Sequence, residues 1–170
     1  NNAGIQHVAP IEKFPISKWE DVIAVNLVAH FHTIASVIEG MRSRGFGRII
    51  NISSVHGLVA SANKSAYVSA KHGVVGLTKT IALECATDGI TVNAICPGWV
   101  RTPIVESQIH VRSEVSGRSF EEEASVLIQE RQPSHTFVTP KQIGNLCLYL
   151  MSEAAANVTG VALPVDGAWT

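Results

Sequence analysis

The chain has 170 residues, of which 46% are hydrophobic and 16% are charged. This length suits one domain with a sizeable core, and the composition excludes an intrinsically disordered chain. The formal net charge of -1 offers no basic footprint for nucleic acid or an anionic membrane, and no apolar run approaches the roughly 20 residues of a membrane helix.

The first half of the chain is predicted to form a helix, a strand and a second helix. Ser17-Lys18-Trp19-Glu20 has the spacing of a capping box, and the apolar periodicity after it predicts a helix that runs to about Arg44 and stops at Gly45. The short β-branched segment within Gly47 to Ser53 predicts a buried strand. A polar loop follows, and then a helix from about Lys64 to Ala86.

The second half alternates in the same way. A strand is expected from Ile90 to Cys96, and Pro97-Gly98 then opens a long excursion, residues 97–138, which contains a charged helical stretch near residues 120–131. Thr139-Pro140-Lys141-Gln142 predicts a helix start, and the last strand is expected over Gly160 to Val165. The alternation predicts an α/β fold with a largely parallel sheet, in which the excursion forms a substrate lid.

Cysteine and histidine usage indicates neither a disulfide framework nor a metal site. Cys85, Cys96 and Cys147 are an odd number without a Cys-x-x-Cys pair, and we interpret them as core residues of a cytoplasmic protein. His30 and His32 lie two residues apart, so a helix would point them to different faces.

The chemistry-bearing pattern is Tyr67-x-x-x-Lys71 on a predicted helix, preceded by Ser53-Ser54 at the end of a predicted strand. The spacing of four places both side chains on one helix face. A phenol is a poor base near neutral pH, but a neighbouring ammonium lowers its pKa, so the oxygen can accept a proton from an alcohol. A serine hydroxyl nearby can hold the substrate oxygen. Taken alone, the same spacing also arises by chance in helices.

Several further segments accompany this pattern in a fixed order. The order and separations resemble the short-chain dehydrogenase/reductase family over essentially all 170 residues, on the segments Asn1-Asn2-Ala3-Gly4, Asn26-Leu27, Asn51-Ile52-Ser53-Ser54, Tyr67-x-Ser-Ala-Lys71, Asn93-x-Ile-x-Pro97-Gly98 and Val165-Asp166-Gly167. The resemblance implies the C-terminal part of a Rossmann-like doubly wound parallel sheet with helices on both faces. It also implies that some 85 to 90 residues upstream of Asn1, with the glycine-rich turn, are absent.

The family assigns roles to residues at matching positions. Tyr67 would be the general acid/base, and Lys71 would lower its pKa and bind the nicotinamide ribose. Ser54, with Ser53 as the alternative, would orient the substrate, and Asn26 would anchor a proton-relay water. Cofactor contacts are implied for Tyr67, Lys71, Asn2, Ala3, Gly4, Pro97, Gly98, Val100 and Thr102. The implied cofactor is NAD, with NADP as the alternative, because the positions that discriminate between them are not in this sequence.

Within the family, the segments around Gln6, His56, Lys64 and Trp99 resemble bacterial-type 3-hydroxybutyrate dehydrogenases. That resemblance implies a substrate carboxylate held by Gln6, His56, Lys64 and Gln108, with Trp99 as a pocket wall. A cation with several neutral donors suits a small carboxylate in a closed pocket, although Lys64 could equally be a solvated first-turn lysine. The expected activity of the intact protein is hydride transfer between 3-hydroxybutyrate and NAD, in a homotetramer.

Two other hypotheses about the function stay open. One is a related reductase that acts on a sugar, a steroid or an acyl-carrier substrate. The other is an inactive truncated chain. Ala168 is one departure from the related enzymes, which commonly have a second glycine after Asp166-Gly167.

Overall fold

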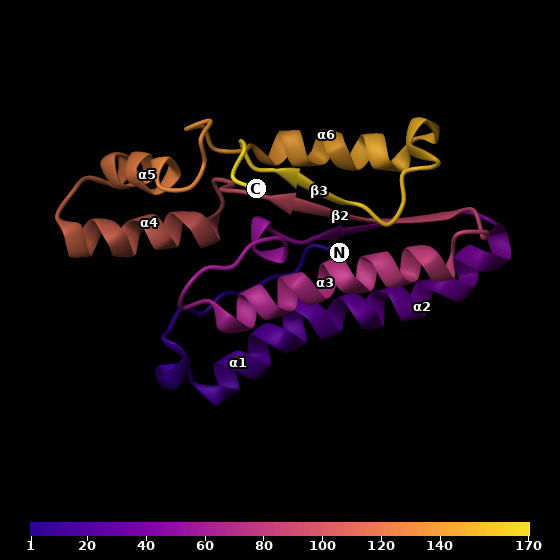
Figure 1. Cartoon of the computed structure of the whole chain (residues 1–170), viewed down its shortest axis with the longest axis horizontal. Helices are drawn as coiled ribbons and strands as arrows, with labels where there is room; N and C mark the ends of the chain where they lie inside the picture. Colours follow the sequence, from indigo (N-terminus) through magenta and orange to yellow (C-terminus); the bar gives the residue numbers. More distant parts are fainter.

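The computed structural model describes all 170 residues and places three parallel strands in one sheet between helices (Figure 1). The strands are β1, Gly47–Ile52, β2, Ile90–Pro97, and β3, Ala162–Val165, in the order β1-β2-β3. Every residue of β2 is buried, because the central strand has a neighbour on each edge and helices over each face. The predicted α/β fold with a parallel sheet and helices on both faces is confirmed.

One face of the sheet is covered by a long, interrupted helix and by α3, Ser65–Glu84. The long helix consists of α1, Ile16–Ile23, a π-helical turn, Ala24–Val28, and α2, Ala29–Arg44. It ends at Gly45 as predicted, with a φ of +61° that glycine adopts without strain.

The start of the long helix differs from the prediction. Pro15 is the N-cap of α1 and no side chain caps the first turn, so Ser17 lies inside the helix and the predicted capping box is wrong. Pro15 takes the N-cap position, with a φ of -63° that its ring presets, so the helix begins two residues earlier than a cap at Ser17 would place it.

The long helix is long and apolar enough, by length and composition, to match the criteria for a membrane span. Over Ile16–Arg44, a stretch of 29 residues, the most apolar 18-residue window has a mean hydropathy of 1.5, and only 22% of that window is buried. No uninterrupted apolar run of that length is present in the sequence, and the helical stretch extends through His30 and His32. Length and composition are the only grounds for this match, and helices of globular proteins meet the same criteria.

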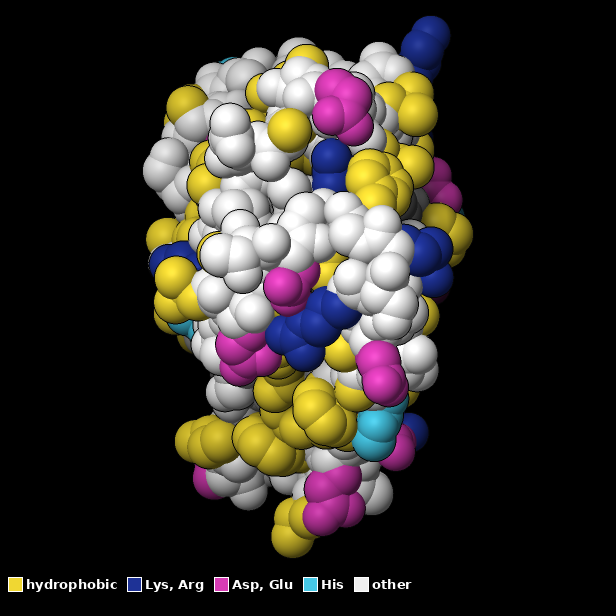
Figure 2. All heavy atoms as spheres, turned by 90° about the vertical axis from the view of Figure 1, so that its right-hand side faces the viewer, with side chains coloured by type: hydrophobic (Ala, Val, Ile, Leu, Met, Phe, Trp, Pro, Cys, Tyr) yellow, Lys and Arg dark blue, Asp and Glu magenta, His cyan; other side chains and the backbone are white.

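At the far end of α2, charged and apolar side chains lie together on the surface. Figure 2 shows hydrophobic side chains next to charged ones on this end of the molecule. The Arg42 Nε atom lies 2.8 Å from a carboxylate oxygen of Asp88, and the Arg48 guanidinium lies 4.5 Å from the centre of the Phe46 ring. The first contact joins the end of α2 to the turn before β2, and the second packs a side chain of β1 on the turn before that strand.

The other face of the sheet is covered by α6, Pro140–Met151. The predicted capping box at its start is confirmed, since the Gln142 N–H donates to Thr139 Oγ1 at 3.2 Å and the Thr139 N–H donates to Gln142 Oε1 at 2.8 Å. Leu150 packs with Ile95 of β2 in the core on this side.

Between β2 and α6, the excursion carries α4, Pro103–Ser116, and α5, Phe120–Gln129, away from the sheet (Figure 1). The two helices are tied by the buried carboxylate of Glu123, which lies 3.1 Å from Arg112 Nε and 2.9 Å from Arg118 Nη1. Hydrogen bonding from Ser116, followed by these arginines, lowers the pKa of Glu123 to about 2. The sequence reading predicted α5 but not α4, whose apolar residues show little helical periodicity.

Candidate active site

The predicted catalytic side chains gather where β1 and β2 end. Ser53 and Ser54 follow β1, and Gly98 and Trp99 follow β2, because the carboxyl ends of parallel strands meet at one edge of a sheet. Helix α3 packs against this edge and brings its first two turns to the site.

Lys71 is buried, with only 3% of its surface exposed. Its Nζ donates to the carbonyl oxygen of Ile52 at 2.8 Å, which fixes the ammonium at the end of β1. Burial lowers the pKa of Lys71 to about 8. The ammonium has three donors and uses one of them within the chain, so it can still donate to a ligand.

Tyr67 lies one turn before Lys71, and the Lys71 Nζ is 5.7 Å from the centre of its ring. Burial raises the pKa of Tyr67 above its ordinary value, and an interaction with the Ser54 hydroxyl acts in the opposite direction. The expected lowering by the neighbouring ammonium is therefore reversed in sign. Removing water from around the phenolate outweighs the interaction with Ser54.

The two serines have different surroundings. Ser53 Oγ donates to the backbone oxygen of Lys71 at 3.0 Å, so its hydroxyl ties β1 to α3. Ser54 Oγ accepts from the His56 N–H at 3.1 Å, which leaves its own proton free to donate. This difference favours Ser54 over Ser53 as the residue that contacts a substrate oxygen.

Asn26 lies in the π-helical turn and is fully buried. Its Oδ1 accepts from the Ile5 N–H at 2.9 Å, and its Nδ2 donates to the Ile5 oxygen at 2.8 Å. The side chain thus pins the first segment of the chain to the long helix, a structural role that the spacing of residues in the sequence does not reveal.

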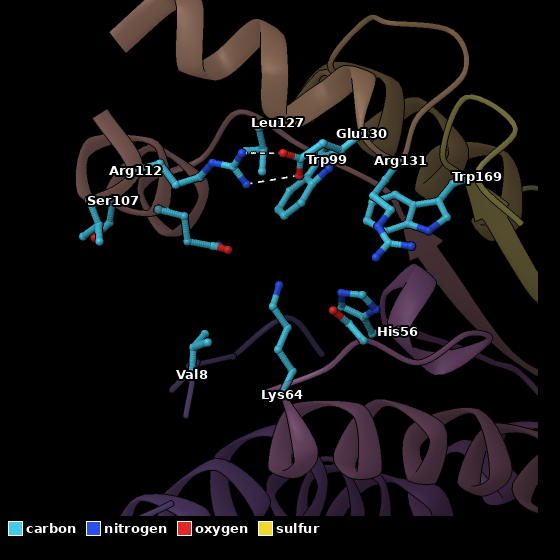
Figure 3. Close-up of a pocket in the computed structure, with 13 residues that line it drawn as sticks. Val8, His56, Lys64, Trp99, Ser107, Arg112, Leu127, Glu130, Arg131 and Trp169 are labelled. Atoms are coloured by element: carbon cyan, nitrogen blue, oxygen red, sulfur yellow. Dashed lines mark hydrogen bonds and ion pairs between the residues drawn. The ribbon is translucent and has the colours of Figure 1, made fainter. Parts of the chain in front are cut away.

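A cavity of about 430 Å³ opens beside these residues, between α3 and the excursion (Figure 3). Four residues predicted to bind substrate line it, namely His56, Lys64, Trp99 and Gln108. Gln6 is not among the lining residues, although Val8 from the same segment is. The structure therefore brings together four of the five predicted substrate contacts.

Other lining residues were not predicted to contact substrate. Arg112, Glu130 and Arg131 reach the cavity from α4 and from the turn after α5, and Trp169 reaches it from the C-terminal segment. Sequence spacing offers no signal for them, because their position depends on how the excursion folds back over the sheet.

His56 is neutral on the wall of this cavity. Burial, followed by the charge of Lys64, lowers its pKa to about 4, and its Nδ1 is buried without a partner. Its ring lies edge-on to Tyr67 and to Trp169, at centroid distances of 6.1 Å and 5.6 Å. The Trp99 Nε1 is also buried without a partner, so both rings keep polar atoms for a ligand.

Lys64 is a cation beside the Trp99 ring. Its Nζ lies 5.3 Å from the centre of the Trp99 ring, and burial, followed by the charge of Arg131, lowers its pKa. No carboxylate pairs with it. Lys64 thus lies half-buried at the N-cap of α3 and lines the cavity.

The residues predicted to bind the cofactor lie at two places. Pro97, Gly98, Val100 and Thr102 follow one another at the end of β2, where the Gly98 N–H donates to the Val165 oxygen at 3.0 Å. Asn2, Ala3 and Gly4 follow Asn1, whose oxygen accepts from the Ile52 N–H at 2.9 Å along the free edge of β1. Both segments thus lie at the carboxyl edge of the sheet, where such folds bind dinucleotides.

Comparison with known proteins agrees with this architecture. The family model described as enoyl-(acyl carrier protein) reductase matches residues 1–170. D-beta-hydroxybutyrate dehydrogenase of Cupriavidus necator is 54% identical over 169 residues, and that of Rhizobium meliloti is 52% identical over 170 residues. These matches cover 99% and 100% of this chain, and 66% of each relative, so the chain spans just under two thirds of their length.

Among solved structures, the actinorhodin polyketide ketoreductase with NADPH superposes with a TM-score of 0.92, at 39% identity, over 99% of this chain and 65% of that one. Levodione reductase superposes with a TM-score of 0.89 at 32% identity, over 98% of this chain and 63% of that one. The fold and the matched residues define a nicotinamide-dependent class of oxidoreductases. The chain belongs to the short-chain dehydrogenase/reductase family.

Proposed function

We propose that the intact protein oxidises 3-hydroxybutyrate to acetoacetate with NAD. The observation that supports this most is the cavity itself, which is lined by an unpaired Lys64 and a neutral His56. His56 in turn lies 6.1 Å from the Tyr67 ring, between ring centres, and donates its N–H to Ser54 Oγ. A hydroxy acid presents a carboxylate and a hydroxyl group. Lys64 in the cavity offers a cation for the first, and Tyr67, beyond the His56 ring, offers a proton acceptor for the second.

The reaction follows from these neighbours. Lys64, His56 and Gln108, with Gln6 from the first segment, hold the carboxylate, and Ser54 donates a hydrogen bond to the substrate oxygen. The hydroxyl proton passes to the phenolate form of Tyr67, which becomes a neutral phenol, and the carbon–oxygen single bond becomes a carbonyl. The chemistry that NAD supplies when bound is acceptance of the hydride from that carbon, so two electrons leave the substrate with it.

The residues present suit the nicotinamide half of such a cofactor. Lys71 keeps two donors free beside Tyr67, which suits the hydroxyls of a ribose. Asn26 acts in our proposal by holding the segment that contains Asn2 to Gly4 against this edge. We favour NAD over NADP because of the similarity to 3-hydroxybutyrate dehydrogenases, and comparing kcat/KM for the two cofactors tests that choice.

We further propose that the excursion, residues 97–138, acts as a substrate lid in a cytoplasmic enzyme. Gln108 and Arg131 come from it and line the cavity. Figure 3 shows Arg131 across the cavity from His56 and Lys64. The Glu123 ion pairs hold α4 and α5 together, so the two helices would move as one unit.

The substrate assignment is tested by removing the charge of Lys64. A hydrogen bond to a charged group contributes roughly 1.5–3 kcal/mol, so Lys64→Ala should lower kcat/KM for 3-hydroxybutyrate by about one to two orders of magnitude. The methyl ester of the same acid should lose little, because it carries no charge. Lys79→Ala, which removes an exposed lysine of α3, is the matched control.

Equal losses for the acid and the ester would contradict the hydroxy-acid assignment. They would leave an alcohol dehydrogenase of other specificity, because the carboxylate would then make no use of the Lys64 charge.

We also propose a homotetramer. Val28, Phe31 and Val37 of the long helix are 40–53% exposed, and Leu83 of α3 is 80% exposed. Apolar faces of this kind on adjacent helices suit an isologous contact across a twofold axis, which explains the membrane-like apolarity of the long helix without a membrane. Sedimentation should show a tetramer at micromolar concentration, and a monomer alone would contradict the proposal.

A further inference from the structure

Arg131 occupies a fixed position at the rim of the cavity. The next residue, Gln132, is buried, and its Oε1 accepts from the Trp99 N–H at 3.0 Å while its Nε2 donates to the Thr136 oxygen. These bonds anchor the turn that follows α5. Figure 3 shows the Arg131 guanidinium pointing from this turn into the cavity, toward His56 and beside Trp169.

The charges around the cavity do not balance. Its lining has three side chains that are cationic at neutral pH, Lys64, Arg112 and Arg131, and one carboxylate, Glu130. That carboxylate lies 2.5 Å from Arg112 and is thereby paired. Lys64 and Arg131 have no carboxylate within 4.0 Å, and His56 is neutral at pH 7. Two positive charges therefore face the space, and a monocarboxylate neutralises one of them.

The two unpaired cations approach the space from different elements. Lys64 lies at the start of α3, and Arg131 lies on the excursion side beyond His56 (Figure 3). The charge of Arg131 lowers the pKa of both Lys64 and His56, which agrees with its facing them. A volume of about 430 Å³ leaves room for a ligand larger than a four-carbon acid, since it falls in the usual range of small-molecule sites.

We propose that Arg131 is a second anion-binding residue of this cavity, and that the protein oxidises hydroxy acids with a second carboxylate at the end away from the first. The inference rests on the proposed function and extends its substrate class. The redox step is unchanged, and only the group that occupies the Arg131 side of the cavity differs.

The test compares two substrates in two proteins. 3-Hydroxyglutarate contains the 3-hydroxybutyrate unit with a carboxylate added at the terminal methyl carbon, and its monomethyl ester has a similar shape with one charge. Wild type should oxidise the diacid, and Arg131→Gln should lower kcat/KM for the diacid by about tenfold or more. The same variant should change kcat/KM for 3-hydroxybutyrate and for the monoester by less than about threefold.

Two control variants complete the design. Arg131→Lys keeps the charge and should retain most of the diacid activity. Arg44→Gln removes an exposed, unpaired arginine at the end of α2 and should affect no substrate.

The possible failures are distinguishable. If wild type oxidises 3-hydroxybutyrate but not the diacid, or if Arg131→Gln lowers both substrates equally, the second anion site is overturned and the proposed function stands. If 3-hydroxybutyrate itself is not oxidised, the proposed function fails and the extension fails with it.

Discussion

Replacing Lys71 by methionine should remove the pH dependence of stability that a buried lysine creates. Its pKa of about 8, against an ordinary value of 10.5, corresponds to about 3.4 kcal/mol at 1.36 kcal/mol per pH unit. Because the lowered pKa makes the folded state bind fewer protons than the unfolded state, folding carries this full cost below pH 8. The cost falls as the pH rises and is largely gone above pH 10.5.

The variant removes the free-energy cost of the buried ammonium but adds a smaller cost of its own. Lys71→Met leaves the Ile52 oxygen without its donor, which costs about 1–3 kcal/mol at every pH. At pH 7 the variant should therefore be as stable as wild type or up to about 2 kcal/mol more stable, although it loses activity. Between pH 7 and pH 10.5 the stability of wild type relative to the variant should rise by about 3 kcal/mol.

Urea unfolding of both proteins, followed by circular dichroism across this pH range, measures the difference directly. Lys79→Met, at an exposed position of the same helix, should run parallel to wild type. Parallel curves for wild type and Lys71→Met would refute the reasoning, because the ammonium would then be solvated in the folded protein.

Two other substitutions test the site and its frame. Tyr67→Phe should lower turnover by at least about 100-fold while cofactor affinity stays within a few-fold, because it removes the proton acceptor and keeps the ring; turnover within tenfold of wild type would argue against the assignment. Gly98→Ala should destabilise the protein by about 1–3 kcal/mol in urea unfolding, because its Cβ would lie 2.5 Å from Gln132 Oε1 and 2.9 Å from Asp166 Cα. Gly144→Ala, whose Cβ would meet nothing within 4 Å, should cost nothing, and a similar loss at both positions would contradict this packing argument.

Local sequence signals predicted the elements whose ends depend on neighbouring residues. Thr139 and Gln142 form the expected box because nothing upstream competes with them, whereas the box at Ser17 is overridden by Pro15, which starts the helix earlier. The π-helical turn around Asn26 carries no local signature, since it depends on the bonds between that side chain and the backbone of Ile5.

The same limit applies to the candidate site. Tyr67 and Lys71 could be predicted because both lie on one helix, and Ser54 because strand ends converge in a parallel sheet. Arg131 could not be, because its approach to His56 depends on the tertiary fold of the excursion. The direction of the Tyr67 pKa also escaped prediction, since it depends on how much water burial removes from the phenol.

The base of the excursion has a consequence for how such proteins diversify. Val100 and Val138 pair as a short parallel bridge, and the Val138 N–H donates to the Trp99 oxygen at 2.9 Å. The segment of 37 residues between these two valines thus begins and ends at this one bridge. Insertions, deletions or exchange of whole helices within this segment would leave the register of β1, β2 and β3 unchanged. Evolution could therefore change ligand preference through this one segment, while Tyr67 and Lys71 on α3 keep their positions.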